Sequence, residues 1–263
     1  MRRITLAHVI AATALFGLAA CGKDSTAPAS LIDDTQVTAD VAASAGEAIA
    51  NDLVGLLGNE IAGALPTAGI NFDLFGTRGD SVAITRTRTC YDAAGAVVAN
   101  CALLTTRRIV FHVTMDGFRI GPYVTGSVHR IRDWSLTRNF STATTPVEVS
   151  RTHDGVGSSA DTLTYANATT NVTRVHNEAS VDSTVGVTFN LPHASNPWPV
   201  SGTMIRNVSL HVVVDTPTRH ETRDVTRRVA VDFPADAQGN VVLHVNDKTC
   251  NLNLVTRAIT GCV

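Results

Sequence analysis

Apolar residues recur at three- and four-residue steps over residues 33–65, which places them along one side of an α-helix. Asp33, Asp34 and Thr35 can cap the start of this helix, and Pro66 marks its end. We expect a helix over about 33–65 that covers one face of a core. The apolar positions are Val37, Val41, Ala45, Ala48, Ile49, Leu53, Leu56, Leu57, Ile61 and Ala64.

The polar side of the same segment is acidic and carries no Lys or Arg. Helices that lie on a membrane surface are usually rich in basic residues on the polar face. We therefore expect the helix to cover a protein core, with its carboxylates in solvent. Its glycines either let it lie close to a sheet or split it into two pieces. The acidic residues are Asp40, Glu47, Asp52 and Glu60, and the glycines are Gly46, Gly55, Gly58 and Gly63.

From about residue 80 the period changes to two, which is typical of β-strands with one buried and one wetter face. Asp116-Gly117 is predicted to form a tight hairpin turn, and residues 234–240 a longer one. No second helical pattern interrupts the strands, so parallel βαβ units are not expected. The alternating runs cover 109–115, 118–120, 163–165, 185–189, 208–214, 225–233 and 241–245.

These patterns predict a mainly β fold, an antiparallel meander of about 9–12 strands with one N-terminal helical segment packed on it. A sandwich, a half-barrel and a curved sheet that grips the helix all satisfy the pattern. We expect a single domain over residues 32–263, because about 230 residues bury a sizeable core without help.

Composition agrees with an ordered domain and limits the classes of partner that the chain can bind. The chain has 263 residues, of which 44 % are hydrophobic and 17 % are charged, so it is not a disordered polar tract. Its formal net charge is −2, and no cluster of Lys and Arg follows the N-terminal segment. Since nucleic-acid binding needs cations that neutralise runs of phosphates, we expect no nucleic-acid partner.

The N-terminus has the layout of an export signal. Met1-Arg2-Arg3 precedes a largely apolar stretch that ends in Leu18-Ala19-Ala20-Cys21. The stretch is short for a permanent membrane span, and no basic flank follows it. These residues resemble the signal peptide and lipobox of bacterial lipoproteins.

The resemblance implies that residues 1–20 are removed and that Cys21 becomes the lipidated first residue, carrying diacylglycerol and often a further acyl chain. Residues 21–31 are small and polar and read as a flexible tether. By the same resemblance, Gly22 in place of Asp favours the outer membrane, with the domain facing the periplasm or the cell surface. The membrane is then a partner through the lipid anchor.

Four cysteines remain once Cys21 is assigned to lipid, and an even number suits disulfides in an oxidising compartment. Proximity favours Cys90–Cys101 and Cys250–Cys262. A turn centred on residues 93–94 would place Cys90 opposite Val97, so the local pairing needs a wider loop. Pairing of Cys90 with Cys250 or Cys262 is the alternative. No CxxC spacing supports a metal site.

Few residues suggest a binding site. His112, His211 and His244 all fall on the wetter face of their strands, where neighbouring strands could bring imidazoles together around a metal. The usual outcome for such residues is a solvent-facing histidine. Trp198 lies in a proline-flanked loop and could stack on a ligand or plug the open end of the sheet.

No catalytic motif stands out. Gly-x-Ser-x-Gly, Ser-x-x-Lys and a Cys–His arrangement are missing from the sequence, and His220-Glu221 lacks the second His of a zinc-protease helix. We assign no catalytic residue and no cofactor. The sequence favours a non-enzymatic envelope lipoprotein that binds another envelope protein or an apolar ligand. A structural or adhesive surface module and a hydrolase with a dispersed site are the alternatives.

Overall fold

A computed structural model describes residues 29–60, 81–99, 101, 105–120, 124–167 and 172–262. Its contacts divide the chain into residues 1–30 and residues 31–263. Of the first unit only residues 29–30 are described, so the architecture below is that of the second.

The predicted helix is present as α1 (Asp34–Glu60). Asp33 caps it, because its carboxylate accepts a hydrogen bond from the backbone N–H of Thr35 at 2.9 Å. The helix is continuous, so its glycines do not split it. Instead they allow close packing: a Cβ on Gly55 would lie 3.1 Å from the Trp134 ring. Residues 61–65 of the prediction lie outside the described residues.

Among the described residues, the remaining elements are eleven strands in one antiparallel sheet of order β11-β10-β9-β8-β7-β6-β5-β4-β3-β1-β2. The predicted mainly β meander of about 9–12 strands with one N-terminal helix is therefore confirmed, and the strands do not divide into the two sheets of a sandwich. The strands are β1 (Ser81–Tyr91), β2 (Val97–Val98), β3 (Arg108–Ile120), β4 (Val124–Phe140), β5 (Glu148–Asn167), β6 (Val172–Asn190), β7 (Ser201–Asp215), β8 (His220–Asp232), β9 (Asn240–Val245), β10 (Lys248–Asn253) and β11 (Ile259–Thr260).

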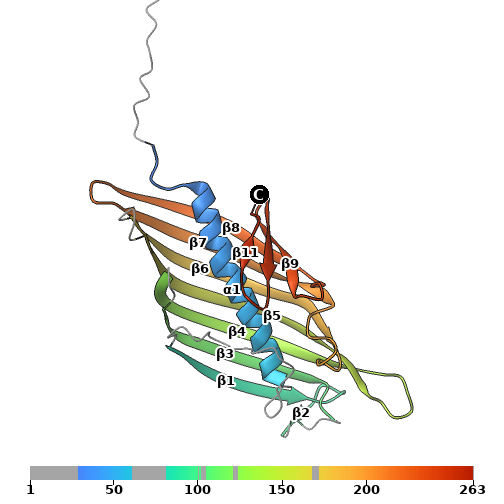
Figure 1. Ribbon diagram of the computed structural model, residues 1–263. Helices are drawn as coiled ribbons and strands as arrows, with labels where there is room; N and C mark the ends of the chain where they lie inside the picture. The colour runs from blue at the N-terminus through green and yellow to red at the C-terminus, as the bar shows by residue number, and fades with distance from the viewer. Residues whose placement is uncertain are drawn as a thin grey trace, which may run out of the picture. The chain divides into compact units, whose positions relative to one another are not determined.

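Helix α1 lies obliquely across one face of this sheet (Figure 1). Its first turn meets β8, where Arg227 pairs with Asp34 at 2.7 Å, and its last turns reach Trp134 on β4. We call the face under α1 the inner face and the opposite one the outer face. Along β7, Val208, Leu210 and the other inner-face residues are buried, whereas those between them are exposed or half-buried.

Two local predictions are wrong. Asp116-Gly117 is not a turn, since both residues lie within β3, opposite His129 and Val128 of β4. The strand tolerates this Asp because its carboxylate pairs with the His129 side chain. Val185 does not share the buried face of Val187, because a bulge at Gly186, which has φ +59°, reverses the alternation within β6.

The local pairing of the cysteines is observed. Disulfides join Cys90 to Cys101 and Cys250 to Cys262, with Cα–Cα distances of 5.5 and 4.1 Å. Cys90 lies opposite Val98 rather than Val97, and the chain reaches Cys101 only after β2, which provides the wider loop. Among the described residues, no helix is long and apolar enough to cross a membrane.

Candidate functional site

The space between α1 and the middle of the sheet contains charged side chains, although an apolar interior is expected there. Asp40 and Asp52 were predicted to face solvent, yet they are 6 % and 4 % exposed and point at the sheet. The prediction failed because arginines on the sheet lie opposite them. We call the whole set the buried ion-pair network. Its members are Asp40, Asp52, Arg130, Arg132, Asp161, Arg174, His176, Glu178, Asp182 and Arg206.

Arg132 on β4 links the helix to the sheet. Its Nε lies 3.0 Å from Asp52 of α1, and its Nη2 lies 2.9 Å from Asp182 of β6. The guanidinium reaches Asp182 by lying over β5 at Gly157, where a Cβ would come within 2.7 Å of the Arg132 chain. Gly157 is thus required for the close approach.

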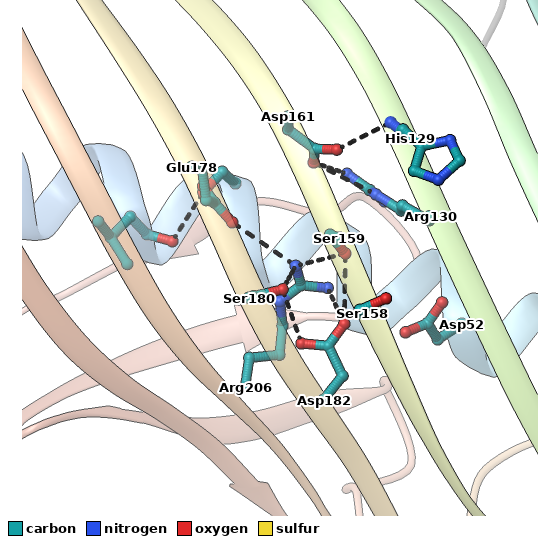
Figure 2. A network of polar contacts seen from close by, with 12 residues as sticks. Asp52, His129, Arg130, Ser158, Ser159, Asp161, Glu178, Ser180, Asp182 and Arg206 are labelled. Atoms are coloured by element: carbon teal, nitrogen blue, oxygen red, sulfur yellow. Dashed lines mark hydrogen bonds and ion pairs between the residues drawn. The ribbon is translucent and has the colours of Figure 1, made fainter.

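Arg206 on β7 meets the network from the other side (Figure 2). Its guanidinium lies 3.4 Å from Asp182 and 3.5 Å from Glu178, and it donates hydrogen bonds to Ser180 at 2.8 Å and Ser159 at 3.2 Å. Arg206 is 2 % exposed, so these groups replace water around a buried cation.

Arg130 on β4 pairs with Asp161 on the neighbouring strand β5 (Figure 2). The guanidinium donates to the carboxylate at 2.8 Å, and the carboxylate also accepts the backbone N–H of His129 at 3.2 Å. Burial alone would lower the pKa of Arg130, but the neighbouring Asp161 outweighs it and raises that pKa. Arg130 is therefore held in its charged form.

Near the start of α1, Asp40 accepts hydrogen bonds from Arg174 of β6 at 3.0 and 3.2 Å. His176 Nε2 lies 3.6 Å from the same carboxylate, which is too long for a hydrogen bond. Burial lowers the pKa of His176 and outweighs the attraction of Asp40. His176 is therefore a neutral imidazole, packed against the Tyr165 ring at 4.8 Å between centroids.

Five carboxyl groups and four guanidinium groups meet in the network, which leaves one carboxyl group in excess. Burial raises the pKa of Glu178 despite the opposing charge of Arg206, and Asp161 raises it further. Ser44 of α1 donates a hydrogen bond to the Glu178 carboxylate at 3.1 Å, which opposes this rise in pKa. Burial is therefore the cause that favours the protonated form of Glu178.

Most polar groups of the network are satisfied by one another, so the arrangement joins helix and sheet rather than exposing a reactive group. A cavity of about 10 Å³ lies beside Asp52, Arg132, Asp182 and Arg206. That is close to the smallest space that holds one water molecule. In the part of the chain that the structure describes, no three His, Cys, Asp or Glu side chains are placed to hold a metal ion.

One signal in the sequence could have indicated this network. Arg206 has the same parity as Val208, Leu210, Val212 and Val214, and is thereby assigned to the buried face of its strand. A charged residue at such a position requires a buried partner of opposite charge. The identity of that partner depends on the strand register, which periodicity alone does not provide.

The three candidate metal ligands are not brought together. His112 lies on β3, His211 on β7 and His244 on β9, with at least one strand between any two of them. Instead, His112 Nδ1 pairs with Asp133 on β4 at 2.7 Å, and His211 Nδ1 with Asp224 on β8 at 2.8 Å. Both pairs are on the outer face, as expected for wetter-face histidines.

Trp198, the other candidate, packs against the hydrophobic core from the loop after β6. A Cβ on Gly239, which has φ +78°, would lie 2.6 Å from its ring. Trp198 therefore packs against the β8–β9 connection.

The outer face exposes apolar side chains on its central strands. At its centre, Val156 on β5 and Val181 and Val185 on β6 are 60 %, 65 % and 56 % exposed. The register places Ser158 of β5 directly opposite Val181 of β6. Val156, two residues before Ser158 on β5, is therefore the diagonal neighbour of Val181. The three side chains form an exposed apolar centre in a largely polar sheet face.

Comparisons with known protein families, with curated proteins and with solved structures found no match. The class defined by fold and site is accordingly a mainly β domain, with a helix held to an open antiparallel sheet by buried ion pairs.

Proposed function

We propose that this protein is a membrane-anchored envelope lipoprotein whose domain is a non-enzymatic binding module for another envelope protein. Cys21 is the proposed anchor, through the lipobox that precedes it. The two disulfides support residence in an oxidising compartment.

The observation that carries the proposal is the exposed apolar centre of the outer face. Val156, Val181 and Val185 lie on the central strands of a broad sheet, and the described residues leave them in solvent. An exposed apolar patch rimmed by polar residues is typical of a protein-binding surface.

The inner face supports a protein partner over an apolar ligand. A pocket for an apolar molecule is lined mainly by hydrophobic and aromatic side chains. The central strands instead present Arg132, Arg206 and Asp182 to α1, each paired with another charge.

Photocrosslinking in intact cells tests the proposal. A photoreactive amino acid at Val181 of the full chain is expected to yield a discrete adduct with one envelope protein, which Val156→Arg abolishes. The matched control is Ala43, which is exposed on the solvent side of α1 and should yield no such adduct. Failure to form an adduct from any of positions 156, 181 and 185, with the protein present in membranes, contradicts the proposal.

A further inference from the structure

Two hairpins on the outer face carry the same arrangement of side chains. In β3, His112-Val-Thr114-Met-Asp116 lies beside β4, and in β8, His220-Glu-Thr222-Arg-Asp224 lies beside β7. The facing strands, β4 and β7, also match each other. β4 contains Ser127-Val-His129 followed by Asp133, and β7 contains Ser209-Leu-His211 followed by Asp215. Each hairpin thus holds two His–Asp pairs with a threonine between them.

The pairs are made in the same way in both hairpins. His112 bonds Asp133 and His129 bonds Asp116, so each strand gives one imidazole and one carboxylate. In the second hairpin the equivalent pairs, at 2.8 and 2.6 Å, are His211–Asp224 and His220–Asp215. We call these two sets the twin His–Asp clusters.

The register relates the clusters by a half-turn about an axis through the Asp161–Glu178 pair of β5 and β6. A row here is the set of residues that lie opposite one another across neighbouring strands. The row that contains His129 includes Ala160 of β5, and the row that contains His211 includes Thr162, one residue to either side of Asp161. The rows of His112 and His220 cross β5 at residues 156 and 166, five residues to either side. The equivalent residues are His112 and His220, Asp133 and Asp215, Asp116 and Asp224, and His129 and His211.

Tandem duplication does not account for the twin clusters. The chain passes through the two types of strand in opposite order, β3 then β4 but β7 then β8, so they are not a tandem repeat. All eight side chains are about half exposed or more. Exposed pairs of this kind contribute little to stability. The shared arrangement therefore indicates a shared ligand chemistry.

The charge of the outer face defines that chemistry. When histidine is left out of the formal count, the face has six aspartates against two arginines among the described residues, and hence a formal charge of −4, whereas the whole chain is −2. An identical face on a second copy would be repelled. The charged residues are Asp116, Asp133, Asp154, Asp215, Asp224, Asp232, Arg108 and Arg228.

We infer that the twin His–Asp clusters are two equivalent subsites for the Lys and Arg side chains of the partner protein. This inference rests on the proposed function, because it assigns the partner's chemistry on the same face. Each cluster offers two carboxylates with imidazoles that fix their orientation. From strand and residue spacings the clusters are roughly 28 Å apart, so a partner must present two basic patches at that separation. The apolar centre lies on β5 and β6, the strands that separate the clusters in the sheet order, with Val156 directly opposite Asp133.

Binding of a fluorescent peptide in which lysine alternates with serine tests the inference on the full-length protein in detergent. We expect two peptides per chain, and about tenfold weaker binding when NaCl rises from about 50 mM to about 300 mM. Asp116→Asn with Asp133→Asn should reduce the stoichiometry to one, as should Asp215→Asn with Asp224→Asn. The fourfold variant should bind none. Asp247→Asn, at an exposed turn, is the matched control.

Three outcomes overturn the inference. They are equal binding of a peptide in which glutamate replaces lysine, an unchanged stoichiometry in both double variants, and a dimer of the protein that the fourfold variant loses. If the Val181 adduct forms undiminished in the fourfold variant, the outer face still binds a protein, but not through these clusters. If the unmodified protein forms no such adduct, the proposed function itself is contradicted.

Discussion

Asp161 and Glu178 lie directly opposite each other on β5 and β6, and both carboxyl groups are buried on the inner face. Two carboxylates at such a position repel each other unless cations or a proton neutralise them. Arg130 serves Asp161 at 2.8 Å, whereas Arg206 lies 3.5 Å from Glu178 and is shared with Asp182. Burial raises the pKa of Glu178, and the more distant Arg206 only partly opposes this rise.

Replacing Glu178 should change how stability depends on pH. Its pKa is raised in the folded protein by burial, so the folded state keeps a proton that the unfolded state has released. The free energy of unfolding should then fall as pH rises above about 4.5, the ordinary glutamate range, and through the folded pKa. Glu178→Gln should make this decline shallower, as measured by urea unfolding at a series of pH values. An unchanged slope, equal to that of the exposed control Asp247→Asn, would contradict a raised pKa.

Removal of Arg132 should be costly. Arg132→Met leaves Asp52 and Asp182 buried without their shared cation, and breaking a buried pair from one side typically costs about 3–5 kcal/mol. Urea unfolding measures the loss. The control Arg228→Met, on the outer face, should change stability by about 0.5 kcal/mol or less. If adding Asp52→Asn to Arg132→Met restores nothing, the loss does not arise from the orphaned carboxylate.

His176 should make the protein sensitive to acid. Burial lowers its pKa in the folded state, so below about pH 6.5 the unfolded state takes up a proton that the folded state does not. Stability that is present above that pH is therefore lost as pH falls toward the folded pKa. His176→Gln should reduce the difference in free energy of unfolding between about pH 7 and about pH 5. His220→Gln, an exposed substitution, is the control, and an equal effect of both variants would count against the assignment.

The alternation of apolar residues was sufficient to predict the sheet because most of its strands bury one face in the core under α1. It failed at Val185, where the bulge at Gly186 shifts the parity, and at Asp116, where a cross-strand histidine holds an aspartate within a strand. The helix was predicted from its stripe of apolar residues. That stripe cannot reveal which residues the sheet presents to Asp40 and Asp52, because a cross-element partner is set by register.

The disulfides should each add stability by restricting the unfolded chain. They close loops with sequence separations of 11 and 12 residues, and the chain-entropy model gives about 3 kcal/mol for loops of this size. Cys90→Ser with Cys101→Ser should lower the free energy of unfolding by about that amount under oxidising conditions. The same variant compared with the unmodified protein in reductant should show no difference. Non-reducing peptide mapping that found Cys90 joined to Cys250 or Cys262 would refute the pairing.

Substitution of Cys21 tests whether a lipid on this residue anchors the protein to a membrane. The lipobox implies that acyl chains on this residue anchor the domain, and each buried CH₂ contributes roughly 0.8 kcal/mol, so two or three chains hold firmly. The unmodified protein should partition into the detergent phase with Cys21 as its first residue. Cys21→Ser should leave the upstream residues uncleaved by the lipoprotein route and lose the lipid-dependent partitioning, whereas Ser25→Ala in the tether should change neither. A mature protein that retains residues before Cys21, or washes from membranes without detergent, would rule out the lipid anchor.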